Sequence, residues 1–568
     1  MSNMTTLSET VNMILGAKGA DVFVNTGDPR LDLSVATVRG ACPVALENAM
    51  TKVLDMGTPE AVEDAVVLTF IARDVRQGKG ERDASYTLFR TLWYRMPELM
   101  RSVLPLLPEY GSWRDVVAMA ITLSPSYTDA AIELIATQLL KDEVAERPSL
   151  CAKWSPREKK KGDALARRLA HFIWKGEPEA GNRMMRYRKL VAGINRRIDT
   201  VEIRMANKDW ASIKPGAVPG RALQLYNRAF LNLVSTSEGG RKVTLSHDAK
   251  SAVRFPDDED RVACATHFTE HFAAAAKGKA KVNGADTVQP HEIVKKAMDI
   301  IDSRGAQAEK DQLNAVWSAI VAKTAAGGGL EDAIVMCDFS GSMQSAGSQG
   351  DLPYWVSLAM GILASYVCKC PKIMSFDSTP TWHTFPEGDL FERLQSISGH
   401  LGKGLSTDFQ AAFELIVADI KKRRAAPGTG PKTVIVFTDM NFDAAKGSEH
   451  GYRHHVKTAP QQTHFQMAKE TFRRLGEDMY GDAEAFPAPT LVIWNLAAGP
   501  TDFQATADEP GVAMLSGWSP TQFAILQKEG PRQMTAYETL RVELDSPRYE
   551  PVRECVRSFV AAGKVEKE

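Results

Sequence analysis

The sequence contains no apolar run near the roughly twenty residues that a membrane-spanning helix needs. Its first residues lack the basic and apolar regions of a secretory signal. The formal net charge is −1, so any nucleic-acid site would be a local patch rather than a property of the whole chain. A composition of 44% hydrophobic and 24% charged residues is that of an ordinary globular protein. We therefore expect a cytoplasmic monomer without a membrane partner.

Disulfide, zinc and catalytic motifs are also missing. The seven cysteines are scattered, which excludes a disulfide framework and the spacing of a zinc site. Cys368 and Cys370 are compatible with a redox or metal pair, or with two sulfurs packed at the end of a helix. There is no P-loop, no Gly-x-Ser-x-Gly elbow, no His-Glu-x-x-His and no kinase motif set. A metal-dependent hydrolase thus has no visible base or nucleophile, and we expect a protein that is not an enzyme.

The most informative stretch that is present is Asp338-Phe339-Ser340-Gly341-Ser342-Met343. It follows a short apolar run, 333–337, that is typical of a buried parallel strand. A strand that ends in this way places one carboxylate and two hydroxyls on a tight loop, and these are hard oxygen ligands of the kind that Mg²⁺ prefers. The carboxyl ends of strands in an open α/β sheet are also where ligands bind.

Two later segments fit the same site. Thr407 precedes a predicted helix over 409–422, and Asp439 ends a second apolar run that begins at 433. The order Asp-x-Ser-x-Ser, then Thr, then a strand-terminal Asp resembles the metal-ion-dependent adhesion site (MIDAS) of von Willebrand factor A domains. The alternative is a Ser/Gly-rich turn after a strand, with Thr407 and Asp408 only capping a helix.

With Mg²⁺ or another divalent cation bound, we assign direct ligation to the hydroxyls of Ser340 and Ser342. Thr407 would bind directly or through a water, and Asp338 and Asp439 would hold waters and orient the hydroxyls. An ion with few direct carboxylates stays strongly electrophilic and would take an acid from a protein partner as its last ligand. The loop that carries His450, His454, His455 and His464 is compatible with a second metal site or with a surface loop.

Strands alternate with helices after residue 330, which predicts a doubly wound, mostly parallel sheet. We expect strands over 333–338, 373–376, 434–439, 491–496 and 512–515, and helices over 352–367, 409–422, 465–475 and 520–527. Ala325-Ala326-Gly327-Gly328-Gly329 is the clearest linker in the chain. We therefore divide the chain into a helical domain, 1–325, and a von Willebrand A-type α/β domain with C-terminal helices, 326–568.

The first half reads as helices joined by short polar turns. Thr58-Pro59-Glu60 is a typical helix start, and Arg73 to Asp83 forms a polar turn that contains glycine. Such helix–turn–helix units in succession favour an all-α HEAT-like solenoid, which could close into a ring. No exact repeat period is visible, so a compact, non-repeating helical domain is the alternative.

A basic stretch runs from Lys153 to Arg204, where fifteen basic residues face six acidic ones, a surplus of nine. Such a patch can neutralise phosphates, and interleaved aromatics such as Phe172 and Trp174 could stack on unpaired bases. The alternative is a solvated charged face, with Phe172 and Trp174 in the helix core. The cations that we select as candidate RNA contacts are Arg183, Arg186, Arg188, Lys189, Arg196 and Arg197.

The turn from Arg73 to Asp83 resembles the arginine- and glycine-rich turn of the Ro ribonucleoprotein autoantigen (TROVE) family, in which a ring of HEAT-like helices precedes a von Willebrand A domain. The chain is still more similar to a related family of unknown function, through Arg-Asp-x-Arg-x-Gly-Lys-Gly-Glu-Arg at 73–82, Pro-Glu-Tyr-Gly-x-Trp at 108–113, Val-Pro-x-Arg-Ala at 218–222, Phe-Thr-Asp-Met-x-Phe-Asp at 437–443 and Ser-Gly-Trp-Ser at 516–519. The Ro resemblance implies binding of small structured or single-stranded RNA. It adds Arg73, Arg76, Lys79 and Arg82 to the candidate RNA contacts.

Two functions remain in view. The first is a non-enzymatic RNA-binding protein with a metal-binding A domain. The second is a metal-dependent adaptor whose metal site binds an acidic residue of a protein partner, without RNA.

Overall fold

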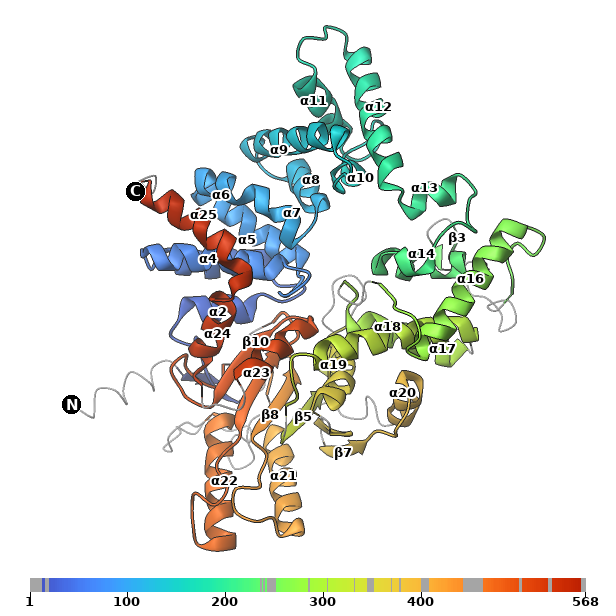
Figure 1. The fold of residues 1–568 in the computed structure, drawn as a ribbon. Coiled ribbons are helices and arrows are strands. Elements are labelled where there is room, and N and C mark those ends of the chain that lie inside the picture. Colours follow the sequence, from blue (N-terminus) through green and yellow to red (C-terminus); the bar gives the residue numbers. More distant parts are fainter. Residues whose placement is uncertain are drawn as a thin grey trace.

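The α/β part of the computed structural model is a six-stranded sheet in the order β10-β9-β8-β5-β6-β7 (Figure 1). Its strands are β5 (Ala333–Asp338), β6 (Lys372–Phe376), β7 (Thr381–Thr384), β8 (Thr433–Thr438), β9 (Thr490–Asn495) and β10 (Val512–Ser516). All neighbours pair in parallel except β7, which pairs antiparallel with β6. The order is the doubly wound one, and its reversal point lies between β5 and β8. The expected mostly parallel sheet is confirmed, whereas the edge strand β7 was not anticipated.

The structure describes residues 13–15, 20–234, 237–238, 241–242, 252–283, 287–303, 305–330, 332–344, 352–368, 370–376, 379–399, 408–442, 463–499, 503–529 and 534–562. The helices of the α/β part are α19 (Pro353–Val367), α20 (Leu390–Ser398), α21 (Phe409–Arg423), α22 (His464–Tyr480), α23 (Phe523–Glu529), α24 (Ala536–Leu544) and α25 (Glu550–Ala561), with short 3-10 turns at Gly341–Gln344, Pro520–Gln522 and Pro547–Tyr549. The positions expected for the central strands and their helices agree with these bounds to within a few residues.

The sheet is buried on both faces, as its β-branched strands require. Val434 and Val436 of β8 belong to one hydrophobic core, and Ile435 and Phe437 belong to another. The first core continues into the helices before residue 200, and the second continues into helices between residues 213 and 330. The sheet therefore separates the two hydrophobic cores, and each core extends into a different part of the helical region.

The first helical arm runs from the sheet to the far end of the molecule (Figure 1). Its elements are β1 (Met13–Leu15), β2 (Asp21–Phe23), α2 (Pro29–Ala36), α3 (Pro43–Leu54), α4 (Pro59–Arg73), α5 (Arg82–Arg95), α6 (Pro97–Val103), α7 (Leu107–Tyr110), α8 (Trp113–Thr122), α9 (Pro125–Val144), α10 (Cys151–Trp154), α11 (Asp163–Ile173) and α12 (Ala180–Ile198), with a 3-10 turn at Leu104–Leu106. Helix α4 illustrates why these segments are helical. The Thr58 hydroxyl accepts from the Ala61 amide at the N-cap, Pro59 lies in the first turn, and most of the remaining helix is buried.

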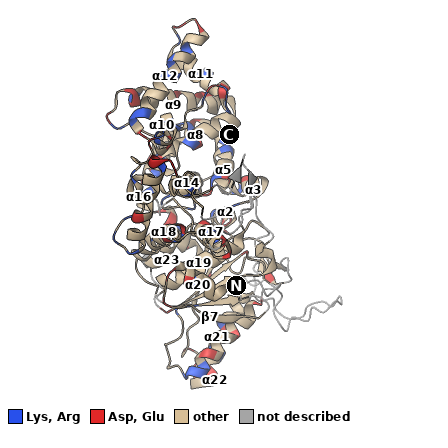
Figure 2. Ribbon diagram, turned by 90° about the vertical axis from the view of Figure 1, so that its right-hand side faces the viewer, with Lys and Arg blue, Asp and Glu red and all other residues tan. Residues whose placement is uncertain are grey.

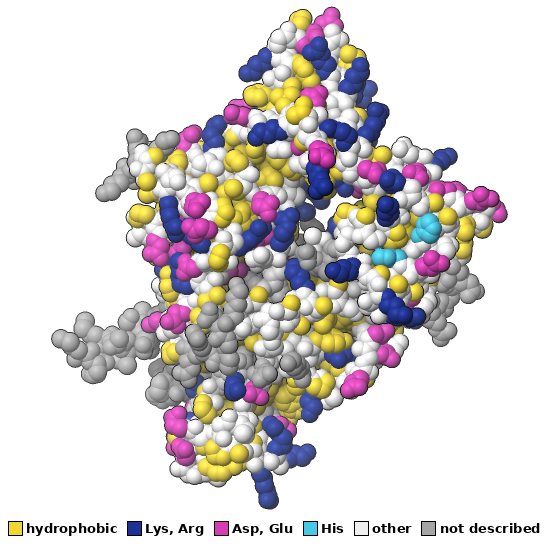
Figure 3. Space-filling model, in the orientation of Figure 1, with side chains coloured by type: hydrophobic (Ala, Val, Ile, Leu, Met, Phe, Trp, Pro, Cys, Tyr) yellow, Lys and Arg dark blue, Asp and Glu magenta, His cyan; other side chains and the backbone are white. Residues whose placement is uncertain are grey.

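The second arm returns to the sheet. It contains α13 (Val201–Ala206), a 3-10 turn at Pro215–Ala217, α14 (Gly220–Phe230), β3 (Ser237–Glu238), β4 (Arg241–Lys242), α16 (Glu259–Ala276), α17 (Pro290–Ser303) and α18 (Gln307–Ala325). Helix α17 packs on α19 and α20, while α2 of the first arm packs on β10. The described helices thus form an arc whose two ends both rest on the α/β part. Figure 3 shows the surface hollowed between the arms, with basic side chains on both sides of the hollow.

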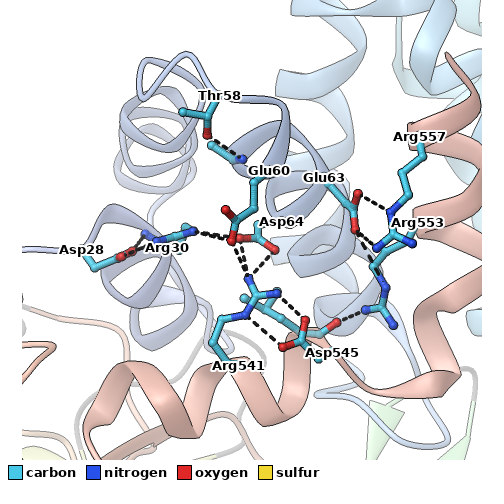
Figure 4. A network of polar contacts seen from close by, with 12 residues as sticks. Asp28, Arg30, Thr58, Glu60, Glu63, Asp64, Arg541, Asp545, Arg553 and Arg557 are labelled. Carbon is cyan, nitrogen blue, oxygen red and sulfur yellow. Dashed lines mark hydrogen bonds and ion pairs between the residues drawn. The ribbon is translucent and has the colours of Figure 1, made fainter. Parts of the chain in front are cut away.

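The C-terminal helices tie the α/β part to the first arm. Helix α25 packs on α4 and α6, and α24 packs on β10, α2 and α4. Figure 4 shows the polar side of this contact, where Asp64 of α4 accepts from Arg541 at 2.8 Å and from Arg30 at 3.1 Å. Glu63 pairs with Arg557 at 2.8 Å. The end of the chain therefore belongs spatially to the helical arm as much as to the sheet.

Candidate metal centre and candidate RNA-binding helix

The candidate metal centre lies where β5 ends. Asp338 is the last residue of that strand, and its side chain is fully buried. Its Oδ1 accepts the Ser340 amide at 2.9 Å, which folds the loop back over the carboxylate. Its Oδ2 accepts the hydroxyl of Thr438, the last residue of β8, at 3.0 Å. The Oγ atoms of Ser340 and Ser342 lie 3.1 Å apart, with Ser342 only partly buried. The loop thus presents two hydroxyls together beside a fixed carboxylate.

Asp439 follows β8 directly and lies next to this loop at the reversal point of the sheet. Its Oδ1 accepts the Asn441 amide at 3.1 Å, and its own carbonyl accepts the Asn441 side-chain amide at 3.3 Å. The left-handed backbone of Met440 (φ 60°) makes this sharp turn possible. Asn441 therefore forms the turn that aims Asp439.

Burial and the neighbouring charge of Asp439 raise the pKa of Asp338 to about 7. Neither carboxylate has an ion-pair partner in the part of the chain that the structure describes. Two buried acids without a cation, beside two clustered hydroxyls, are a donor set that a hard divalent cation fits. No group of three His, Cys, Asp or Glu side chains suited to a metal occurs among the described residues. A cation here would depend on the serine hydroxyls.

Three other sequence-predicted features bear on this site. Thr407, His450, His454 and His455 lie outside the described residues. His464 is described: it is buried at the start of α22, where its ring packs edge-on to Phe409 at 5.4 Å between centroids. Thr463 caps that helix. His464 therefore serves the core of the α/β part. Asp408 caps α21 by accepting from the Ala411 amide at 2.9 Å.

The candidate RNA-binding element is helix α12, which lies with α11 at the end of the molecule far from the sheet (Figure 2). One side of α12 is apolar and buried through Met184, Tyr187, Leu190, Val191 and Ile194. This 3.6-residue periodicity leaves the intervening cations outside. Arg186, Lys189 and Arg196 are all exposed, and none has an ion-pair partner among the described residues. These three residues are called the α12 basic face below.

The other three predicted cations of α12 are engaged by the protein itself. Arg188 pairs with Glu158. Arg183 donates to the Pro178 carbonyl at 3.1 Å. Arg197 donates to the Ala145 carbonyl at 3.0 Å, beyond the last turn of α9. Because these groups already have partners, their gain from contacting a phosphate is smaller than that of the α12 basic face.

The arginine- and glycine-rich turn does not present two of its four candidate cations, Arg73 and Lys79, to solvent. Arg73 is buried and pairs with buried Asp115 at 2.6 Å. Lys79 is also buried, and its Nζ donates to the Ser34 carbonyl at 2.6 Å and to the Ser516 hydroxyl at 2.7 Å. The prediction that Arg73 and Lys79 contact RNA does not agree with this burial, because a phosphate cannot reach either group without opening the fold.

Arg76 and Arg82 of the same turn are about half exposed. Arg76 donates to the Glu109 carbonyl and lines a cavity of about 410 Å³ that the turn shares with α18, α23 and α24. Arg82 lies 3.4 Å from Asp115. The turn thus mainly connects the first arm to the α/β part, and this contact region is called the joint below. Gly78 passes so close to the Ile71 carbonyl that a Cβ would lie 2.2 Å from it, which excludes a side chain there.

Sequence reasoning missed the partners of this joint. Asp74 is fully buried and pairs with Arg548 at 2.9 Å, and the Thr521 hydroxyl donates to the Gly78 carbonyl at 2.9 Å. Gly517 takes a left-handed φ of 100° where the Lys79 side chain packs against it. The motifs at 73–82 and 516–519 offered a sequence signal for this contact, because two motifs without catalytic residues could have been expected to pack on each other.

Comparisons with known proteins give similarities but assign no activity. A family described as "Domain of unknown function (DUF7788)" matches residues 332–551, which begin at the first strand of the sheet. The "Uncharacterized protein L728" of Acanthamoeba polyphaga mimivirus is 24% identical over 482 residues, covering 80% of this chain and 75% of that protein.

Among solved structures, the crystal structure of the Deinococcus radiodurans Ro (RSR) protein is similar to 85% of this chain and 90% of its own, with 13% identity and a TM-score of 0.25. In the described part of the chain, no helix is both long and apolar enough to cross a membrane.

Proposed function

We propose that this protein binds RNA without catalysis, through the α12 basic face, and that its α/β domain holds a divalent cation. The observation that carries the RNA proposal is the set of three exposed cations, Arg186, Lys189 and Arg196, that lack ion-pair partners among the described residues. Cations already paired with acids must give up those partners to contact phosphate. Unpaired ones lose only water and counterions, so they are the groups from which phosphate binding draws its salt-dependent affinity.

The geometry of α12 supports an extended backbone as the ligand. Lys189 and Arg196 are seven residues apart on the helix, or about two turns, so they face the same side about 10 Å apart along the axis. Arg186 lies one turn before Lys189. Such a row suits successive phosphates of one strand, small structured RNA or a single-stranded segment alike, because it reads no base edges.

The cation in the α/β domain is the second part of the proposal. Ser340 and Ser342 would hold Mg²⁺ directly, Thr407 directly or through water, and Asp338 and Asp439 through waters that they orient. Bound there, the cation would supply an electrophilic site for an acidic group. Asp338 is held by Thr438 and by the Ser340 amide, so its role is to fix the loop rather than to move a proton.

The proposal is tested by purifying the protein from its native source without nuclease and sequencing any nucleic acid that accompanies it. We expect RNA that leaves the protein at high salt. Nucleic-acid-free protein that elutes with a second polypeptide in a fixed ratio would contradict the RNA proposal.

That second outcome would favour a metal-dependent adaptor, for which the candidate metal centre is the specific observation. An adaptor of this kind should lose its partner when Asp338 and Ser340 are both replaced by alanine, and should keep it after ribonuclease treatment. Retention of the partner by the double variant would count against the adaptor.

A further inference from the structure

A hollow of about 480 Å³ lies between α6, α9 and α11 of the first arm. It is lined by Arg101, Asp129, Ile132, Glu133, Arg167, Arg168, His171, Phe172 and Lys175. Its volume falls within the range of about 300–1,000 Å³ that is usual for small-ligand sites. The lining of the hollow includes no candidate ligand of the metal centre, and its Arg167 shares Glu158 with Arg188 of α12.

Phe172 is the unusual feature of this hollow. The apolar side of α11 is buried through Leu165, Ala166, Leu169 and Ala170, and Phe172 continues that side by one turn. The helix ends at Ile173, which is partly buried against the first core, whereas Phe172 is 36% exposed. The alternative that places Phe172 in the helix core does not agree with this exposure. An apolar ring is left in a concave, mostly basic surface.

The cations around the ring differ in how strongly they are held. Arg167 pairs with Asp163 at 2.8 Å, and Arg168 pairs with Asp129. Lys175 has no acidic partner among the described residues; its Nζ lies 4.9 Å from the centroid of Phe172. Within the described ranges, the one acidic contact of Arg101 is a long one with Glu98, at 3.9 Å. Lys175 and Arg101 are thus the two cations most available to an anion in the hollow.

We propose that this hollow binds one nucleotide of single-stranded RNA, with its base stacked on Phe172 and its phosphate held by Lys175 and Arg101. The proposal rests on the proposed RNA-binding function and adds a base-contacting subsite to it. Every base has a π-face, so stacking on an exposed ring tolerates any sequence, and it acts only on unpaired bases. Asp129 and Glu133 also line the hollow, and their carboxylates can accept hydrogen bonds from exocyclic amino groups of a base.

The test separates base stacking from charge. Fluorescence anisotropy would measure the affinity of the full-length protein for a labelled fifteen-residue oligouridine and for an abasic phosphodiester oligomer of equal length. We expect Phe172→Ala to weaken oligouridine binding about tenfold, as loss of one stacked base does, and to leave abasic binding unchanged. Phe172→Trp should bind oligouridine at least as tightly as the wild type. Tyr94→Ala, at an aromatic that is 64% exposed on α5 outside the hollow, is the matched control and should bind like the wild type.

The possible results distinguish the subsite from the function. If the wild type binds oligouridine and Phe172→Ala binds each oligomer as tightly as the wild type does, the subsite is overturned while RNA binding stands. If Phe172→Ala weakens both oligomers alike, or Phe172→Trp fails to keep wild-type affinity, stacking is overturned as well. If the wild type binds neither oligomer, both the subsite and the proposed function fail.

Discussion

The ammonium of Lys79 donates a hydrogen bond to the hydroxyl of Ser516 at 2.7 Å, although the two residues are 437 positions apart in the chain. Ser516 is the last residue of β10, and the same Nζ also donates to the Ser34 carbonyl, near the end of α2, at 2.6 Å. One buried lysine therefore joins the first arm, the arginine- and glycine-rich turn and the carboxyl edge of the sheet. The turn that resembles part of an RNA-binding family is a structural joint in this chain.

The burial of Lys79 predicts a pH dependence of stability. Burial lowers the pKa of Lys79 to about 8, from an unfolded value of about 10.5. Between these two pH values the unfolded chain holds a proton that the folded protein has lost, so the free energy of unfolding rises with pH. We therefore expect the free energy of unfolding of the wild type, minus that of Lys79→Met, to increase by about 3 kcal/mol from pH 7 to pH 11.

Urea unfolding of both proteins at several pH values measures this difference, and the subtraction removes the titration of all other groups. A difference that stays constant across this range would show that Lys79 does not lose its proton in the folded state.

Two arginines of the C-terminal helices should differ sharply in their effect on stability. Arg548 pairs with Asp74, which is fully buried, so Arg548→Ala leaves an uncompensated charge inside the joint and should cost about 3–5 kcal/mol. Arg557 pairs with Glu63 but is itself 56% exposed, and Glu63 keeps its contact with Arg553, so Arg557→Ala should cost at most about 1 kcal/mol. Denaturant unfolding measures the free energy of unfolding of both variants. Equal losses of this free energy would contradict the claim that the buried Arg548–Asp74 pair contributes more to stability than the exposed pair.

The candidate metal centre predicts that affinity for a divalent cation depends on a serine hydroxyl. Ser342 is only partly buried, so Ser342→Ala should keep the fold while it removes a direct ligand. We expect Mn²⁺ binding, followed by electron paramagnetic resonance of the free ion, to weaken at least tenfold. Ser398→Ala, at an exposed serine of α20, should bind Mn²⁺ like the wild type. Equal Mn²⁺ affinity in all three proteins would exclude Ser342 as a ligand.

The α/β fold could be predicted because its strands are short runs of apolar residues with an acid at the end of two of them. Runs such as Val434-Ile435-Val436-Phe437 fit only a strand covered on both faces, and the alternation with helices then fixes the topology. The edge strand β7 escaped prediction because Thr381-Trp382-His383-Thr384 is half exposed and carries no apolar run.

The roles of the arginines and lysines were harder to predict, since a cation at a buried joint and a cation at a binding surface look alike in sequence. The structure shows that apolar positions recur between the basic ones in α12, which places the cations outside, but this period does not separate the three engaged cations from the three without ion-pair partners. The turn at 73–82 has no such period, and its partners Asp115, Ser516 and Arg548 come from distant parts of the chain. Long-range pairs of this kind cannot be derived from local pattern.

The most direct test of the central claim is the salt dependence of RNA affinity with and without the α12 basic face. Anisotropy titrations of oligouridine at several salt concentrations would compare the wild type with a variant carrying Arg186→Gln, Lys189→Gln and Arg196→Gln. A second variant, with glutamine at the exposed Lys277, Lys279 and Lys422, is the matched control. Three lost phosphate contacts should flatten the slope of log K against log salt by about 2, and the control should keep the wild-type slope. A slope and affinity equal to those of the wild type in the α12 variant would contradict RNA binding at this face.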